Sequence, residues 1–235
     1  MEIYDSNHIF FNFRKITFVV FTSIYHVSNK KYNCKIRILM QIDVDLLFSW
    51  GAIAKKYKRN EVVFNENELA QFYFQIIEGS VRMFNSNDEG KEFTQGLFCD
   101  GDSFGEPPLF IDEKYPSTAV AFHDSTIIKL SKEKFLTILD EYPTIQRSIL
   151  KLMAQRIHNK ANTSKEIINQ KPEFRVLAFL NTFKKKSGVA EKILIPYTRQ
   201  EIANFTGLRV ETVIRVFTKM NNCNKVEIIH HKIYY

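Results

Sequence analysis

The stretch TRQEIANFTGLRVETVIRVF, residues 198–217, decides the fold of the C-terminal part of this chain. It opens on Thr198 with Glu201 three residues later, a capping box in which each residue satisfies an exposed amide at the start of a helix. Gly207 stands where a sharp turn between two helices needs a residue that tolerates positive φ. Apolar residues then recur at helical spacing: Val213, Val216, Phe217 and Met220. The pattern predicts a helix-turn-helix.

Charge is distributed unevenly along the 235 residues, whose formal net charge is +7. Residues 40–140 sum to −7, residues 141–170 to +3 and residues 171–235 to +7, while residues 1–39 add +4. An acidic middle followed by a basic C-terminal third indicates that only this third meets a polyanion. The alternative is a solvated basic surface.

Composition excludes several classes of protein. An apolar content of 45% with 25% charged residues is typical of a soluble globular chain. The cysteines are Cys34, Cys99 and Cys223, without C-x-x-C spacing, which argues against a disulfide scaffold, a zinc finger or a cysteine-held cluster. We therefore expect a cytoplasmic protein with no cofactor and no metal. His123 and His158 are solitary, as surface or core histidines usually are, and Cys99 fits a buried inert thiol better than a redox switch.

The N-terminal residues 1–39 lack a clean helical or strand period. Their apolar run, residues 16–25, is 10 residues long, short of the roughly 20 that span a bilayer. No cleavage site of a signal peptide follows. Our hypothesis is that the native start is Met40 and that residues 1–39 are translated upstream sequence. A weak membrane anchor is the alternative, but we expect no membrane contact.

The middle of the chain changes from strand to helix patterns. Short strands separated by turn formers are predicted at residues 62–64, 72–77, 80–84, 93–98, 118–122 and 127–130, a spacing typical of an antiparallel roll or barrel. A short helix from Ser131 and a longer one after Pro143 follow, then an amphipathic helix over residues 174–183. Gln170-Lys171-Pro172 interrupts the helical pattern and predicts a hinge between domains.

The longer helix carries one apolar stripe. Its residues are Ile145, Ile149, Leu152, Met153 and Ile157. A single stripe on so long a helix predicts a dimer seam. Packing of the helix on its own barrel is the alternative. The predicted parts are thus an N-terminal extension (1–39), a β-roll sensor domain (40–140), a dimerisation helix with its hinge (141–170) and a C-terminal domain (171–235).

Residues 198–217 closely resemble the DNA-binding signature of the Crp/Fnr family of bacterial regulators, particularly its Fnr-like branch. The family's landmarks in its cyclic-nucleotide-binding roll have counterparts in order: Gly79, Gly90-Lys91-Glu92, Gly101-Asp102 and Phe104-Gly105-Glu106. Residues 226–235 resemble the wing, and the resemblance covers residues 41–235. It implies an α+β fold with an antiparallel β-roll, a long dimerisation helix and a winged helix-turn-helix. It further implies a homodimeric transcription regulator that binds an inverted repeat in double-stranded DNA, with RNA polymerase as another partner.

The resemblance also assigns the DNA contacts. Glu211 and Arg215 would bind base edges, because arginine can donate two hydrogen bonds to guanine and glutamate can accept one from cytosine. Ile214 offers only an apolar contact where family members often carry a polar residue, so the half-site departs from theirs. The expected contacts to the DNA backbone are Thr198, Arg199, Gln200, Arg209 and Thr212. For each charged residue, solvated surface is the alternative.

The candidate effector pocket departs from the family's nucleotide site. Its residues are Gly105, Glu106, Ser117 and Thr118. Glu106 can still accept from a ribose hydroxyl, but Pro107 and Pro108 follow it and have no N–H to offer a phosphate. No arginine lies between Arg82 and Arg147 to balance the phosphate charge. We therefore expect little or no binding of cyclic AMP, and the effector is unknown.

Two rival interpretations remain open. A cupin-like enzyme on the same kind of roll would need several histidines and a carboxylate converging inside it, and only His123 falls in this segment. We therefore expect no enzyme. The second rival interpretation is a ligand-binding signalling module whose C-terminal domain contacts another protein. DNA binding that weakens steeply with salt and needs Arg215 would distinguish the regulator from it.

Overall fold

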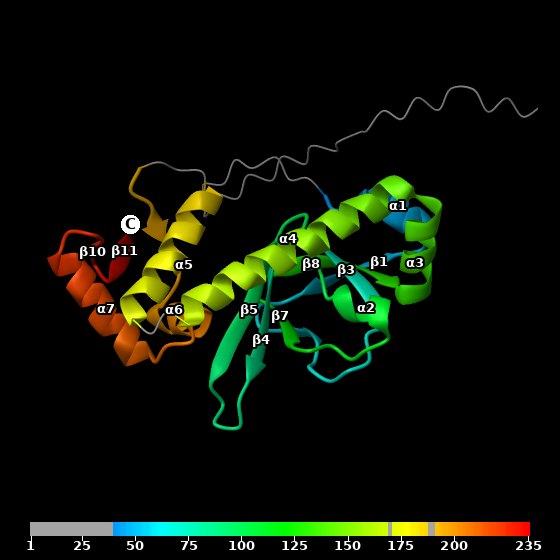
Figure 1. The fold of residues 1–235 in the computed structure, drawn as a ribbon. Coiled ribbons are helices and arrows are strands. Elements are labelled where there is room, and N and C mark those ends of the chain that lie inside the picture. Colours follow the sequence, from blue (N-terminus) through cyan, green and yellow to red (C-terminus); the bar gives the residue numbers. More distant parts are fainter. Residues whose placement is uncertain (1–39, 169–170, 188–190) are drawn as a thin grey trace, which may run out of the picture.

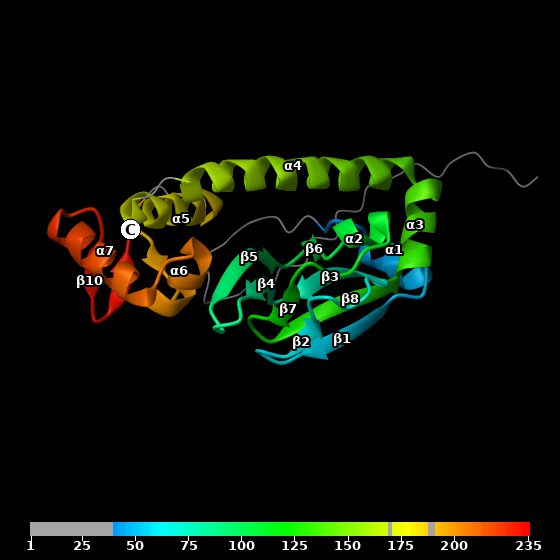
Figure 2. The same cartoon turned by 60° about the horizontal axis from the view of Figure 1, so that its bottom comes forward.

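The computed structural model describes residues 40–168, 171–187 and 191–235. Our hypothesis on residues 1–39 therefore lies outside the described residues. Figure 1 shows a β-roll and a smaller helical domain at opposite ends of one long helix, α4, and Figure 2 shows the roll lying along one side of that helix. The expected α+β architecture with a long helix and a winged helix-turn-helix is confirmed.

Two four-stranded antiparallel sheets form the roll. The first has the order β1 (Ile53–Tyr57), β8 (Ser125–Ser131), β3 (Phe72–Glu78) and β6 (Ser103–Phe104), and the second has β2 (Val62–Phe64), β7 (Thr118–Ala121), β4 (Ser80–Ser86) and β5 (Glu92–Cys99). The six predicted strands are confirmed. Strands β1 and β6 were not predicted, because β1 exposes four of its five residues and β6 has only two, so neither shows an alternating pattern.

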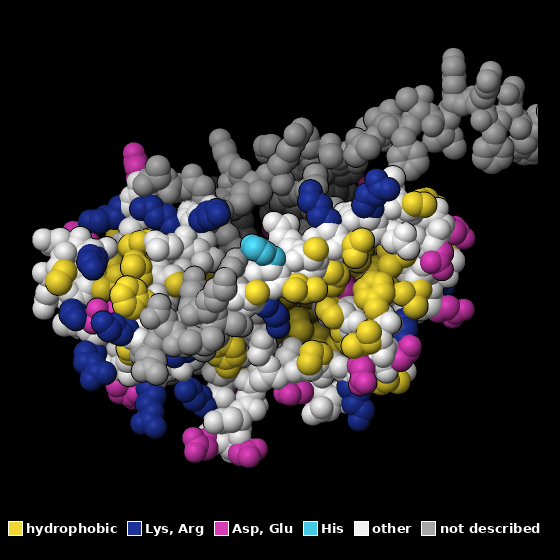
Figure 3. All heavy atoms as spheres, viewed as in Figure 1, with side chains coloured by type: hydrophobic (Ala, Val, Ile, Leu, Met, Phe, Trp, Pro, Cys, Tyr) yellow, Lys and Arg dark blue, Asp and Glu magenta, His cyan; other side chains and the backbone are white. Residues whose placement is uncertain are grey.

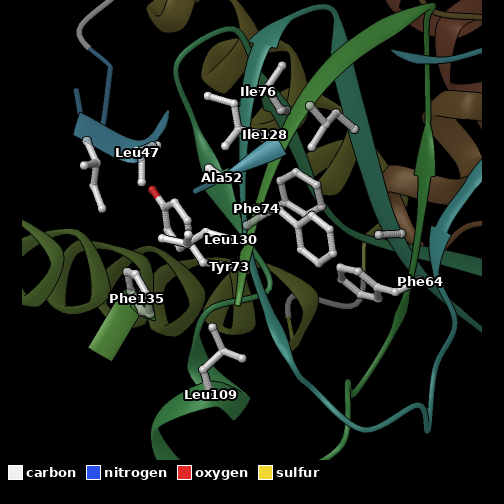
Figure 4. Close-up of a cluster of buried hydrophobic side chains, with 14 of the residues drawn as sticks. Leu47, Ala52, Phe64, Tyr73, Phe74, Ile76, Leu109, Ile128, Leu130 and Phe135 are labelled. Atoms are coloured by element: carbon white, nitrogen blue, oxygen red, sulfur yellow. The ribbon is translucent and has the colours of Figure 1, made fainter. Parts of the chain in front are cut away.

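Aromatic rings fill the space between the sheets (Figure 4). Phe64 stacks on Tyr115 with ring centroids 3.7 Å apart, and Phe74 stacks on Phe104 at 5.4 Å. Tyr73 stacks on Phe135 of the next helix at 4.4 Å, and both are fully buried. Such offset pairs add to the free energy gained from apolar burial. This core fixes the roll against its helices.

Four helices accompany the roll. They are α1 (Val44–Ser49), α2 (Pro107–Ile111), α3 (Lys132–Glu141) and α4 (Pro143–Ile168). The first half of α4 belongs to the core of the roll: Ile149 is 2% exposed, and Ile145 and Met153 pack against the same core. These three residues of the predicted dimer seam thus face their own chain, as the alternative held. Leu152 is half-buried, and Ile157 is 70% exposed.

The C-terminal domain has its own core. It comprises α5 (Pro172–Ser187), β9 (Leu194–Ile195), α6 (Arg199–Thr206), α7 (Val210–Asn222), β10 (Glu227–Ile229) and β11 (Lys232–Tyr234), with a sheet in the order β10-β11-β9. Val176 and Leu180 of α5 are fully buried against α6, α7 and the sheet. The second core makes this domain a separate hydrophobic unit from the roll.

The roll meets the C-terminal domain where β5 lies against α6. Glu92 accepts hydrogen bonds from Arg82 of the roll, at 2.6 Å, and from the Asn204 amide of α6, at 3.2 Å. Lys91 Nζ also donates to the carbonyl of Gly207 at 3.4 Å. The β4–β5 hairpin is therefore a polar contact between the roll and the helix-turn-helix.

Candidate nucleic-acid interface

The start of α6 is fixed by its capping box. Thr198 Oγ1 accepts from the amide of Glu201 at 3.1 Å, and Glu201 Oε2 accepts from the amide of Thr198 at 2.7 Å. The predicted box is confirmed. Gln200 is exposed and donates to Asn204 Oδ1 at 2.9 Å. The exposed positive end of α6 is thus available to a polyanion.

The turn between α6 and α7 requires glycine. Gly207 has a φ of +65°, and a Cβ there would lie 2.7 Å from the Arg175 guanidinium and 3.3 Å from the Phe93 ring. Arg175 in turn donates to the carbonyl of Thr206. The left-handed residue ends α6 and sets the angle at which α7 leaves the turn. The predicted role of Gly207 is confirmed.

Helix α7 divides into a buried and an exposed face. Its apolar face lies in the core of the domain: Val213, Val216, Phe217 and Met220. Glu211, Ile214 and Arg215 are exposed, with Ile214 49% accessible. Among the described residues, neither Glu211 nor Arg215 has a side-chain hydrogen bond or ion pair. The predicted base-contacting residues therefore lie together and unpaired on one helix face, and their role stays a prediction.

Arg209 lies at the first position before α7. Its carbonyl accepts from the amides of Thr212 and Val213, at 3.0 and 3.1 Å, while its side chain is exposed and makes no cap. An arginine thus precedes the positive end of the helix, where phosphate oxygens bind well. Thr212 is half-buried one turn into α7. The backbone contacts of both residues stay predictions.

A groove of about 590 Å³ joins α6, α7 and the wing strands. Its lining includes Thr198, Arg199, Ile214, His231 and Lys232. Arg199 spans it, because its Nη1 donates to the carbonyl of His231 at 2.9 Å. Burial lowers the pKa of Arg199 from its ordinary value, and the guanidinium keeps further donors for a phosphate. His231 and Lys232 border this groove and were not among the predicted DNA contacts.

The β4–β5 hairpin borders the other side of α7. A second groove of about 380 Å³ is lined by Gly90, Lys91 and Glu92 of the hairpin and by Arg209, Val210 and Glu211 at the start of α7. The roll thus places a lysine and a glutamate next to the predicted base-contacting helix. Sequence patterns gave no sign of this proximity, because it depends on the path of α4.

Figure 3 shows where charge gathers on one face of the molecule. Lysine and arginine side chains are concentrated over the domain formed by α5–α7 and the wing, and acidic side chains over the roll and its hairpin. This separation follows the net charges of +7 for residues 171–235 and −7 for residues 40–140. The positive end is the one that carries α7.

The glutamate of the candidate effector pocket is buried and paired within the chain. Glu106 is completely buried, and its Oε2 accepts from Arg156 Nη1 at 2.7 Å. Arg156 reaches in from α4, also donates to the carbonyl of Ser103 at 2.5 Å and lies 5.1 Å from the Phe98 ring. Glu106 Oε1 and Ser103 Oγ are buried without a hydrogen-bond partner among the described residues. The pocket's carboxylate is thus already paired with a cation.

The remaining predicted pocket residues serve the roll. Gly105 adopts a φ of +76° beside the rings of Phe64 and Tyr115. Ser117 is 2% exposed, and Thr118 Oγ1 accepts from the amide of Glu66 at 3.0 Å. The structure therefore brings Glu106 to a polar cluster but gives Thr118 a partner in the chain.

Arg156 was missed in the sequence, although a signal existed. It lies seven residues after Ile149 and three after Met153, so helical spacing puts it on the same face as these two residues. Once Ile149 is known to face the roll, Arg156 must face it too. The choice between roll and dimer seam could not be made from the periodicity alone.

The described ranges 40–168, 171–187 and 191–235 lack two features of other functional classes. Within them no group of three or more His, Cys, Asp or Glu residues is placed to hold a metal ion. Nor do these ranges contain a helix that is both long and apolar enough to cross a bilayer. His123 shares a 2.7 Å hydrogen bond with Ser80 Oγ and lies edge-on to Phe122.

Comparisons with known proteins agree with this architecture. The family model of the cyclic nucleotide-binding domain matches residues 54–142, and that of the Crp-like helix-turn-helix domain matches residues 174–234. The nitrogen fixation regulation protein FixK of Bradyrhizobium diazoefficiens is 25% identical over 178 residues, which are 74% of each protein. The cyclic AMP receptor protein of Thermus thermophilus is 25% identical over 174 residues, 74% of this chain and 79% of that protein.

Solved structures share the fold. The c-di-GMP responsive global regulator CLP of Xanthomonas campestris superposes with a TM-score of 0.71 at 19% identity, over 80% of this chain and 96% of that one. FixK2 of Bradyrhizobium japonicum gives a TM-score of 0.67 at 20% identity, over 77% and 91%. With both domain models matched in the order in which they occur here, the chain belongs to the Crp/Fnr family of DNA-binding transcription regulators.

Proposed function

We propose that the chain acts as a homodimer that binds an inverted repeat through Glu211 and Arg215 of α7, and that its roll does not respond to cyclic AMP. The observation that carries the DNA contact is the unpaired exposed face of α7, backed by a fully packed opposite face. Because the apolar face anchors the helix, its exposed side chains are held together on the face that would enter the major groove. The proposed division keeps 40–140, 141–170 and 171–235 as sensor, dimer helix and DNA-binding domain.

The dimer seam that we propose on α4 uses other residues than the apolar stripe predicted from the sequence. Ile145, Ile149 and Met153 are used by the roll, whereas Leu150 is 68% and Ile157 70% exposed. The exposed apolar positions of α4 recur at a spacing of four, three and four residues: Leu150, Ala154, Ile157 and Ala161. This spacing is that of the a and d positions in a two-helix seam. Two copies joined there would present two α7 helices to the two half-sites.

Three observations support a roll without cyclic AMP. Glu106 is paired with Arg156, and Arg82 is paired with Glu92, so both of these arginines are already engaged. Pro107 and Pro108 are the first residues of α2 and have no N–H for a phosphate. A cyclic phosphate would therefore lose its water without gaining charge-assisted donors.

We propose RNA polymerase as a further partner, and we assign no effector to the roll.

In vitro selection of bound DNA tests the DNA contact. Wild-type protein should recover inverted repeats with half-sites about one helical turn, roughly 34–36 Å, apart. Arg215→Lys keeps the charge but loses the two-donor fork, so one base pair of each half-site should lose its preference. Arg209→Ala is the matched control: it should leave the selected sequence unchanged and reduce the salt slope of binding by about 0.9 per phosphate contact. Recovery of no common sequence by the wild type would contradict the proposal.

Isothermal titration calorimetry tests the roll. Cyclic AMP should give no measurable heat with the wild-type protein, and its addition should leave the DNA affinity unchanged. A saturable interaction at micromolar cyclic AMP would refute this part of the proposal while leaving the DNA contact intact.

A further inference from the structure

The turn of the wing is built from two histidines in an uncommon backbone conformation. His230 and His231 alone join β10 to β11, with φ values of +46° and +63°. Positive φ at both residues is the geometry of a tight two-residue hairpin turn, for which Asn-Gly is the strongly preferred sequence. Every other residue described with positive φ is glycine, asparagine or aspartate. The histidines therefore stand at two positions for which asparagine and glycine are the preferred residues.

Strain of this kind is retained where a side chain has a use. Both histidines are exposed, and neither has a side-chain hydrogen bond within the described residues. The described hydrogen bonds of the domain do not use either imidazole ring, so both rings are available to bind a partner.

His231 of the turn lines the same groove as the predicted DNA contacts Thr198, Arg199 and Ile214, and His230 directly precedes it. His231 and Ile214 both line the groove of about 590 Å³, and Arg199, which also lines it, donates to the His231 carbonyl. A duplex seated on the exposed face of α7 would therefore pass the wing turn. The phosphate backbone, with its dense negative charge, is the part of a duplex that such a turn would meet.

The charged groups around the turn leave it positive. Arg199 approaches from α6 and Lys232 follows in β11. The carboxylate of β10, Glu227, is paired with Lys192. Histidine is the side chain whose ordinary titration falls within the physiological range, and its charged form donates from both ring nitrogens.

We propose that His230 and His231 form a proton-dependent phosphate contact, so that DNA binding by this regulator strengthens as the pH falls. The inference rests on the proposed function and adds a condition under which it acts. By linkage, the protein would take up protons when it binds DNA, up to about two per chain, and its affinity for DNA would rise by the same coupling as the pH falls. Each protonated ring that meets a phosphate would also steepen the salt slope by about 0.9.

The test exchanges the turn for its preferred sequence. The double variant His230→Asn/His231→Gly suits the backbone better, so its melting temperature should equal or exceed that of the wild type. Binding of an in vitro selected duplex is then measured by fluorescence anisotropy between about pH 8 and 5.5, across the ordinary titration of histidine. Wild-type affinity should rise about three- to tenfold over this range, as two exposed charge contacts allow. The variant should show a flat profile and a shallower salt slope.

The matched control is His158→Gln, which removes an exposed histidine of α4 and should follow the wild-type profile. Parallel pH profiles of the wild type and the turn variant would overturn the inference. A flat pH profile of the His158→Gln control, like that expected of the turn variant, would also overturn it. Binding of equal strength by the turn variant at low pH would also overturn it. Absence of binding by the wild type at every pH would overturn the proposed function, and this inference with it.

Discussion

The C-terminal domain and the roll use their charged side chains in opposite ways. On α7, Glu211 and Arg215 are exposed and have no partner among the described residues, whereas in the roll Glu106 is buried and paired with Arg156 of α4. An unpaired charge in water keeps its full capacity to bind a new partner, while a buried pair must be broken before either member can bind. The difference shows which charged side chains are open to a new partner, those of α7, and which are already satisfied within the chain, that of Glu106 in the roll.

Helix α4 links the two regions, so breaking its proposed seam should have the largest effect. The double variant Leu150→Asp/Ile157→Asp places charges in an apolar seam without touching the core of the roll. The chain should become a monomer by light scattering, and affinity for the full inverted repeat should fall about 10²- to 10⁴-fold, because the second half-site no longer binds intramolecularly. Thr144→Asp, at an exposed position before the seam, is the control. If the double variant remains a dimer, the proposal that α4 forms the dimer interface is wrong.

The buried pair of the roll can be broken by Arg156→Ala. It leaves Glu106 buried without its cation, and we expect the free energy of unfolding to fall by about 2–4 kcal/mol, since the arginine is itself partly exposed. Urea unfolding measures this, with Arg147→Ala, an exposed arginine of the same helix, as the matched control. Equal stability of both variants would mean that the Glu106–Arg156 pair contributes nothing to the free energy of unfolding. The charged side chains of the roll would then be as free to bind a new partner as those of α7.

The cap of α6 offers a comparison within the C-terminal domain. Thr198→Ala removes the acceptor of the Glu201 amide and should cost about 1 kcal/mol of unfolding free energy. Thr182→Ala, an exposed threonine of α5, should cost much less. If DNA affinity falls in the first variant by more than its loss of stability explains, Thr198 also contacts the DNA backbone, as expected. An unchanged melting temperature would argue against the cap as a determinant of the fold.

The smallest effect is expected where the two regions touch. Glu92→Gln keeps the shape of the hairpin contact but removes a negative charge from the groove beside Arg209. DNA affinity should rise by a few tenths of a kcal/mol at low salt and lose this gain at high salt, because exposed charges are screened. Glu113→Gln, exposed elsewhere on the roll, should have no effect. A weaker affinity in Glu92→Gln would show that the contact supports the DNA-binding orientation.

Local chemistry in the sequence determined much of this protein. The capping box of Thr198 and Glu201, the left-handed turn at Gly207 and the buried face of α7 follow from short-range hydrogen bonding and from a period of 3.6 residues. The alternating segments and turn formers likewise determined six of the eight strands of the roll. These features depend on residues within one or two turns of each other, so they can be recognised without the fold.

Tertiary structure alone decided how the faces are used. The apolar period of α4 is the same whether Ile149 packs on its own roll or on a second copy, and only the path of the helix after α3 settled that it packs on the roll. That path carried Arg156 to Glu106, 50 residues away in sequence, and the β4–β5 hairpin to the start of α7. The sequence therefore specified which side chains could bind DNA, and long-range packing decided which charges stayed free to do so.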